Sequence, residues 1–364
     1  MDYRASLGSA LGFLQKSAQS LGRALPGPEL KETATKLEAF RLFASVAQDL
    51  RLPETLPSLP ELIRFADRLP AWQRSFSQEG ITHHYVNKIP PAQLEAGLLA
   101  DPELPETAMV PMHAGLGLSL AMDALDTQGL SPSADELEGA LTGFIEGCRA
   151  HSRPGWAESA IEGLGLAVRT THPHLRNPVS EVLGQMDPTA QYLFWHGLGR
   201  SLYFLPKHFL SIGNSHERAL ESAVREAPTP ECRRNAVAGL VWAVTLVNIK
   251  SPEIVEAFLR KAAPLRMPEA FTNGVISALM VWKHMVPDGD HTLTPYLRSV
   301  SPSGIHGGRW HDLIAEPARQ AFEMTFPVLI RPVATTGSGA FTPTIGSLFQ
   351  YHETGMPDLK SLSS

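Results

Sequence analysis

The pattern of apolar and polar positions predicts helices along most of the chain. In the second half, short segments with one polar face alternate with longer segments that are apolar almost throughout. Several segments begin with proline, which suits the first position of a helix. The short helices are expected at 178–186, 216–226 and 252–261, and the long ones at 188–205, 231–248 and 268–285. We interpret the long helices as an inner layer and the short ones as an outer, solvated layer.

Glycines within the apolar helices are the most distinctive feature of the sequence. Gly197 and Gly199 lie inside the segment Tyr-Leu-Phe-Trp-His-Gly-Leu-Gly-Arg-Ser-Leu-Tyr-Phe-Leu at 192–205. Glycine costs about 1 kcal/mol relative to alanine in a helix interior, so close approach of another helix or a ligand is expected there. Similar glycines precede apolar runs at Gly115, Gly163, Gly239 and Gly274. Including Gly197, their spacings of 48, 34, 42 and 35 residues suit two-helix repeats. We predict an all-α fold of stacked helical hairpins with glycine-bearing inner helices.

Proline-rich connectors and the composition of the C-terminus divide the chain into three regions. We expect an N-terminal helical region at 1–104, a helical-repeat core at 105–326 and an extended C-terminal tail at 327–364. The tail is predicted because threonine, serine, glycine and proline dominate it. Residues 4–23 predict an amphipathic helix, for which docking on the protein is preferred over binding to a membrane surface.

Two segments depart from the helical pattern. Residues 81–90, Ile-Thr-His-His-Tyr-Val-Asn-Lys-Ile-Pro, are rich in β-branched and aromatic residues and form a β-like, strand-like stretch, for which a surface loop or hairpin edge is the preferred interpretation. Residues 286–312 form a long stretch rich in glycine and histidine, which favours a functional or mobile loop.

Composition excludes several classes of protein. The 43% hydrophobic and 19% charged residues are typical of a soluble globular protein, and the net charge of -6 gives no broad electrostatic reason to bind nucleic acid. We predict no transmembrane segment, because no apolar run reaches about 18 residues. Cys148 and Cys232 form neither a disulfide framework nor a metal-ligand spacing, so a cytoplasmic location is expected.

Polar side chains beside the glycines are the candidates for chemistry. We expect Glu162, His196 and Arg200 to be catalytic, with the latter two on one helix face. The expected substrate-binding residues are His113, Trp195, Gly197, Gly199, Phe204, Trp242, Asn273 and Trp282. Together they could form an apolar cleft with a few converging polar groups, the usual form of a ligand site. Individually satisfied core residues are the alternative. No metal site is predicted, and any cofactor is left open.

Several segments of the second half carry a resemblance to a known family. They are Gly-Leu-Gly-Arg-Ser-Leu-Tyr-Phe at 197–204, the helix around Gly239 preceded by Arg233 and Arg234, Asn-Gly-Val-Ile-Ser-Ala-Leu at 273–279, and Glu-Pro-Ala-Arg-Gln-Ala-Phe at 316–322. These segments, and 112–121, resemble bacterial proteins of unassigned activity encoded in enediyne and related polyketide gene clusters. The resemblance implies a role in natural-product biosynthesis, involving a long conjugated polyene, but supplies no catalytic residues.

Two functional hypotheses follow. The first is a biosynthetic protein that binds a polyene or long acyl chain between its helices, with biosynthetic partner proteins; whether it modifies the chain is left open. The second is a non-catalytic helical-repeat scaffold whose concave face binds a partner protein.

Overall fold

The chain is helical throughout the part that the structure describes. The structure is a computed structural model that describes residues 28–53, 55, 57–90, 93–287, 291–305, 307–334 and 342–352. Within these ranges there are helices and connecting segments but no strand, which confirms the predicted all-α fold. The amphipathic segment expected at 4–23 lies outside the described residues.

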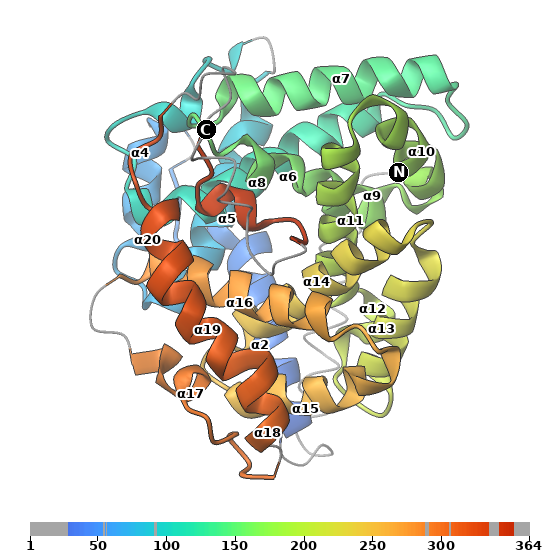
Figure 1. The fold of residues 1–364 in the computed structure, drawn as a ribbon. Coiled ribbons are helices and arrows are strands. Elements are labelled where there is room, and N and C mark those ends of the chain that lie inside the picture. The colour runs from blue at the N-terminus through green and yellow to red at the C-terminus, as the bar shows by residue number, and fades with distance from the viewer. Residues whose placement is uncertain are drawn as a thin grey trace.

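A curved row of long helices forms the centre of the molecule (Figure 1). In spatial order they are α2 (Pro28–Ala44), α5 (Ala71–Lys88), α6 (Met109–Asp126), α9 (Gly163–Thr171), α11 (Pro188–Leu202), α14 (Pro230–Val247) and α16 (Pro268–Met285). The row turns back on itself, because Trp72 Nε1 of α5 donates to the Val247 carbonyl at the end of α14, 3.0 Å away. His284 Nε2 of α16 lies 3.0 Å from the Glu106 carbonyl beside α6.

Four further helices of the described ranges cover the outside of this row. They are α7 (Ala134–His151), which lies along the top of Figure 1, α10 (Arg176–Met186), α13 (Ser215–Glu226) and α15 (Pro252–Ala262). In α7 the buried residues Leu137, Leu141, Phe144 and Cys148 recur every three or four positions, so one face packs inward and the other meets solvent. By contrast, α14 is buried over nearly all of its length. The two-helix repeat itself stays a prediction, as does the division into three regions.

Short elements connect the long helices. They are α3 (Val46–Asp49), α4 (Leu59–Ile63), η1 (Arg64–Ala66), η3 (Leu98–Ala100), η4 (Glu106–Ala108), α8 (Ala157–Ile161), η5 (Pro173–Leu175), α12 (Pro206–Phe209), η6 (Ala263–Leu265), η7 (His291–Leu293) and α17 (Thr294–Leu297). The last two occupy part of the segment expected to be a loop at 286–312.

The loop or hairpin edge expected at 81–90 is wrong, because α5 continues through this segment to Lys88. Ile81 and Thr82 are fully buried on α5, and the helix packs closely against α6. Thr82 Oγ1 donates to the Gln78 carbonyl one turn earlier, 3.1 Å away, so its hydroxyl is satisfied within the helix. Tertiary burial therefore outweighs the β propensity of these residues.

Residues 307–329 follow one helical path that contains two wide turns. Its parts are α18 (Gly307–Trp310), the π-helical η8 (His311–Ala315), α19 (Glu316–Gln320), the π-helical η9 (Ala321–Thr325) and α20 (Phe326–Leu329), coloured orange to red in Figure 1. Pro317 and Pro327 follow the two π turns, which relieve the clash between each proline ring and the preceding turn. Pro317 cannot bond the Leu313 carbonyl, which instead accepts from Thr272 Oγ1 of α16 at 2.9 Å.

The segment 342–352 is not an extended tail but packs into the core. It contains η10 (Ile345–Leu348), and Ile345, Leu348 and Phe349 are buried. The Phe349 ring lies 5.4 Å from the ring of Trp242. Three large apolar side chains within five residues gain enough from burial to order this otherwise polar segment.

We expect Phe349→Ala to lower the free energy of unfolding by about 3 kcal/mol, because it leaves a cavity in the core. Chemical denaturation followed by circular dichroism measures the change. Ile330→Ala is the control, since Ile330 is 51% exposed and its loss should change stability by less than about 0.5 kcal/mol. Equal effects of the two substitutions would contradict the packed position of Phe349.

Candidate functional site

Neighbouring helices of the central row touch through their backbones at three ionisable residues. The carbonyls of Glu79, Glu162 and His196 each face a glycine of the next helix, respectively Gly115, Gly197 and Gly239. A Cβ atom at these glycines would lie 2.3, 2.1 and 1.9 Å from the facing oxygen, far closer than any real contact. Only glycine fits these positions without movement of the backbone. The close approach brings the three side chains into one region.

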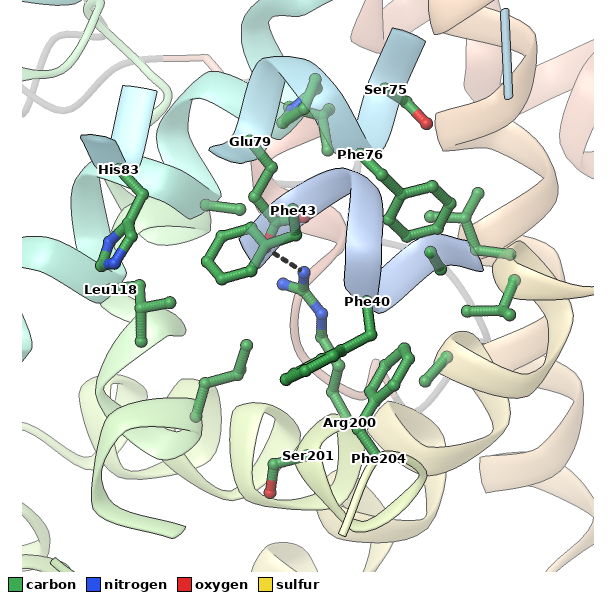
Figure 2. Close-up of a pocket in the computed structure, with 18 of the residues that line it drawn as sticks. Phe40, Phe43, Ser75, Phe76, Glu79, His83, Leu118, Arg200, Ser201 and Phe204 are labelled. Atoms are coloured by element: carbon green, nitrogen blue, oxygen red, sulfur yellow. Dashed lines mark hydrogen bonds and ion pairs between the residues drawn. The ribbon is translucent and has the colours of Figure 1, made fainter. Parts of the chain in front are cut away.

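Arg200 of α11 joins these side chains into a buried network. Its Nη2 atom donates to Glu79 Oε1 at 2.7 Å, as Figure 2 shows, and its Nη1 atom donates to Glu162 Oε2 at 3.0 Å. The other oxygen of Glu162 lies 3.1 Å from His196 Nδ1. The guanidinium of Arg200 on α11 therefore connects α5, which carries Glu79, with Glu162 at the turn between α8 and α9.

The two carboxyl groups of the network differ in their electrostatics. Burial raises the pKa of the Glu79 carboxyl; Arg200 opposes this rise, and the charge of Glu162 adds to it. Burial acts on Glu162 in the same direction, but Arg200 and His196 together bring its pKa below the usual value. Glu162 is therefore the firmly charged partner of Arg200, and Glu79 is the group that takes up a proton more readily.

A cavity of about 140 Å³ lies beside Arg200 on the inner side of the row. Its wall is mainly apolar, and its aromatic members are Phe40, Phe43, Phe76, Phe204 and Trp242. Figure 2 shows the Arg200 side chain extending towards Glu79 between the labelled phenylalanine rings. Several lining residues, among them Phe40, Phe204 and Thr170, are partly or fully exposed, so the wall of the cavity extends to the surface.

The structure brings the three expected catalytic residues together, but only Arg200 lines the cavity. Glu162 and His196 are completely buried behind it. Phe204 and Trp242, which were expected to bind substrate, do line the cavity, and the guanidinium carbon of Arg200 lies 5.0 Å from the centre of the Trp242 ring.

Three of the expected substrate-binding residues on α11 have packing positions. Gly197 and Gly199 contact backbone of the adjacent helices; a Cβ at Gly199 would lie 1.9 Å from the Ala236 carbonyl oxygen. Trp195 points to the outer layer, where its Nε1 donates to Ser180 Oγ of α10 at 2.8 Å. None of them is among the described residues that line the cavity.

The remaining three expected residues also lie outside the cavity wall. His113 is buried on α6, with Nδ1 2.7 Å from the Met109 carbonyl and its ring stacked on Trp156. Burial lowers the pKa of His113 to about 3, so the ring is neutral. Asn273 and Trp282 are buried within α16. Their side chains belong to the core between helices.

Sequence reasoning missed Glu79 and the aromatic residues of α2 and α5. A signal for Glu79 exists, because Glu79 directly precedes Gly80 inside a helix, as Glu162 precedes Gly163. The loop or hairpin edge expected at 81–90 concealed that pattern. For Phe40, Phe43 and Phe76 no local signal distinguishes a cavity wall from ordinary core.

A second buried ionic cluster fixes α2, which carries Phe40 and Phe43 over the cavity. Glu32 Oε1 of α2 accepts from Tyr203 OH at 2.6 Å and lies 2.7 Å from His216 Nε2. Lys36 Nζ lies 3.5 Å from the same oxygen. Despite burial, His216, Lys36 and Tyr203 lower the pKa of Glu32 to about 2, whereas burial lowers the pKa of Lys36 to about 8.

Comparison with known proteins adds no assignment. No family model, no curated protein and no solved structure matches this chain. The similarity to proteins of enediyne gene clusters therefore stays a prediction from the segments that carry it.

Two further features bear on ligands and location. Among the described residues, no group of three or more histidine, cysteine, aspartate or glutamate side chains is arranged to hold a metal ion. One helix within the described ranges, Glu106–Asp126, is long and apolar enough to cross a membrane, but 72% of its apolar window is buried inside the protein. That burial fits the core helix of a soluble protein.

We expect Gly239→Ala to lower the free energy of unfolding by about 2–3 kcal/mol, because the new methyl group collides with the His196 carbonyl. Gly143→Ala is the matched control on α7, where nothing lies within 4 Å of the added Cβ. It should be neutral or stabilising by up to about 1 kcal/mol. Urea denaturation measures the free energy of unfolding of both variants. An unchanged value for Gly239→Ala would refute the close backbone contact.

Acid should weaken the cluster that fixes α2. The pKa of Glu32 in the folded protein, about 2, lies below the usual 4.5, so its stabilisation is complete above pH 4.5 and is lost as pH falls towards 2. Between about pH 6 and pH 3, we expect the parent to lose about 2 kcal/mol more unfolding free energy than the double variant Glu32→Gln/Lys36→Met. Lys36 stays protonated throughout this interval.

Urea denaturation at each pH measures this difference. In the double variant the glutamine keeps an oxygen acceptor for Tyr203 and His216, and the methionine removes the otherwise unpaired buried charge. Glu29→Gln, at an exposed acid of the same helix, should follow the parent. Equal acid losses in the parent and the double variant would show that Glu32 does not carry the effect.

Proposed function

We propose that this protein binds an apolar small molecule in the cavity beside Arg200, with the polar end of the ligand at Glu79 and Arg200. The observation that carries the proposal is that the charged pair Arg200 and Glu79 lines a mainly apolar cavity wall, to which Ser75, His83, Thr170 and Ser201 also contribute polar side chains. Burying such a network generally stabilises a fold less than apolar packing of the same volume does. Its presence beside a cavity is therefore better explained by binding than by stability.

The size of the cavity limits what it holds in this conformation. A volume of about 140 Å³ is comparable to engineered cavities of about 150 Å³ that hold benzene. A polyene or long acyl chain would therefore place one end in the cavity. The rest of the chain would extend to the surface past exposed parts of the wall such as Phe40, Phe204 and Thr170.

The geometry distributes roles among the expected catalytic residues. Arg200 and Glu79 line the cavity and would touch the ligand, so they are the candidates for any chemistry. Glu162 would act as a positioning residue because it holds the guanidinium from behind, and His196 because it in turn holds Glu162. The proposed setting, polyketide natural-product biosynthesis with partner proteins, rests on the resemblance of segments such as 197–204. The scaffold alternative gives the cavity and its charged wall no role.

Binding of diphenylhexatriene, a neutral fluorescent polyene, tests the proposal. We expect saturable binding, and we expect Ala114→Phe, which fills the cavity, to weaken it at least about tenfold. Ala150→Phe, at an exposed position of α7, is the control and should bind like the parent.

Fluorescence titration measures the affinities, and thermal melting confirms that each variant is folded. Absence of saturable binding to the parent would overturn the proposal. Equal binding by the parent and a folded Ala114→Phe variant would place the ligand elsewhere.

A further inference from the structure

Arg200 is poorly placed to receive an anionic ligand, although it and His83 are the basic side chains of the described cavity wall. Both of its terminal nitrogens already bond carboxylates, Glu79 at 2.7 Å and Glu162 at 3.0 Å. Its guanidinium group also lies over the Trp242 ring. A ligand carboxylate approaching Arg200 would therefore meet two carboxyl groups already in place, and repulsion between like charges disfavours that arrangement.

Two carboxyl groups of the network, those of Glu79 and Glu162, share the single guanidinium of Arg200. His196 Nδ1 lies 3.1 Å from Glu162, and its buried Nε2 has no hydrogen-bond partner among the described residues; the rings of Trp242 and Phe349 pack around it. Because Arg200 divides its hydrogen bonds between the two carboxyls, Glu79 does not have the guanidinium to itself.

Glu79 is the carboxyl group of the network that reaches the cavity. This residue is 8% exposed and lines the cavity. Its Oε1 atom accepts from Arg200, while no donor among the described residues is recorded at Oε2. Burial raises the pKa of this carboxyl, and a bound cation is the partner that would offset that cost.

The cavity wall around Glu79 is aromatic. Phe40, Phe43, Phe76 and Phe204 line it together with Trp242. The negative faces of aromatic rings attract ammonium groups, with contributions of about 0.5–2 kcal/mol each. An ionisable carboxyl among aromatic rings is a common arrangement for recognising amines with apolar substituents.

We propose that the ligand carries a protonated amine or ammonium group, which Glu79 and the aromatic wall of the cavity recognise, on an apolar body that fills the rest. This inference rests on the proposed function and narrows the ligand class. It disfavours a free fatty acid, which an arginine in the cavity wall would otherwise suggest. A neutral ligand that accepts a hydrogen bond from protonated Glu79 is the competing possibility, and the test below separates the two.

Matched twelve-carbon chains that differ only in the head group test the proposal. Dodecylamine, dodecanol and dodecanoate, each below its micellar concentration, compete with diphenylhexatriene for the parent protein at neutral pH. We expect dodecylamine to displace the probe at a concentration at least about tenfold lower than dodecanol, and dodecanoate to be the weakest. The preference should persist in about 0.5 M salt, because buried charges are screened less than exposed ones.

Glu79→Gln and Glu138→Gln form the matched pair of variants. The first should reduce the difference between amine and alcohol to within about threefold, whereas the second changes an exposed acid of α7 and should keep the preference of the parent. This control also excludes general attraction of the amine to the net charge of -6. If Glu79→Gln does not fold, the order in which the amine, the alcohol and the carboxylate displace the probe from the parent protein still tests the amine proposal.

Each outcome separates the amine proposal from the proposed function. If all three chains displace the probe equally, or if dodecanol or dodecanoate competes best, the amine proposal is wrong and apolar binding stands. If neither the probe nor any chain binds, both are wrong. An amine preference that survives Glu79→Gln would remove Glu79 from the recognition.

Discussion

Contact between helix backbones at glycine is the constraint on which this structure depends. Side chains usually keep the axes of packed helices about 8–10 Å apart, and glycine lets the helices approach more closely. Here three of these close approaches fall at the carbonyls of Glu79, Glu162 and His196. The same contacts that pack the row therefore also bring ionisable side chains to Arg200. Packing and the candidate site cannot be changed independently.

The charged network has properties that a structural role alone explains poorly. A guanidinium shared by two buried carboxyls is costly to desolvate, and one of these carboxyls, that of Glu79, lines the cavity. The aromatic wall, contributed in part by α2, makes the cavity a suitable place for an apolar molecule. The second ionic cluster, around Glu32, holds α2 in position and thereby completes the cavity.

Local patterns explain which parts of the fold could be predicted. The helices from α6 to α16 follow apolar periodicity and proline starts, so the sequence located most of them within a few residues. The segment 81–90 was misread because β-branched residues there gain more from burial on α5 than from their local preference. The segment 342–352 looked like a tail because its three buried apolar residues, Ile345, Leu348 and Phe349, span little more than one helical turn, too short for a period to stand out.

The amino-acid sequence is enough to predict the all-α fold and the shared helix face of His196 and Arg200, since these depend on residue type and on spacing along one helix. The repeated glycines suggested that Glu162 joins them, but spacing along a helix could not show that contact. Only the tertiary structure decided that Glu79, 121 positions from Arg200, completes the network and that α2 closes the cavity. It also placed His113, Trp195, Asn273 and Trp282 in the core. The reason is physical: a helical pattern states which face is buried, but not which of the buried faces meet.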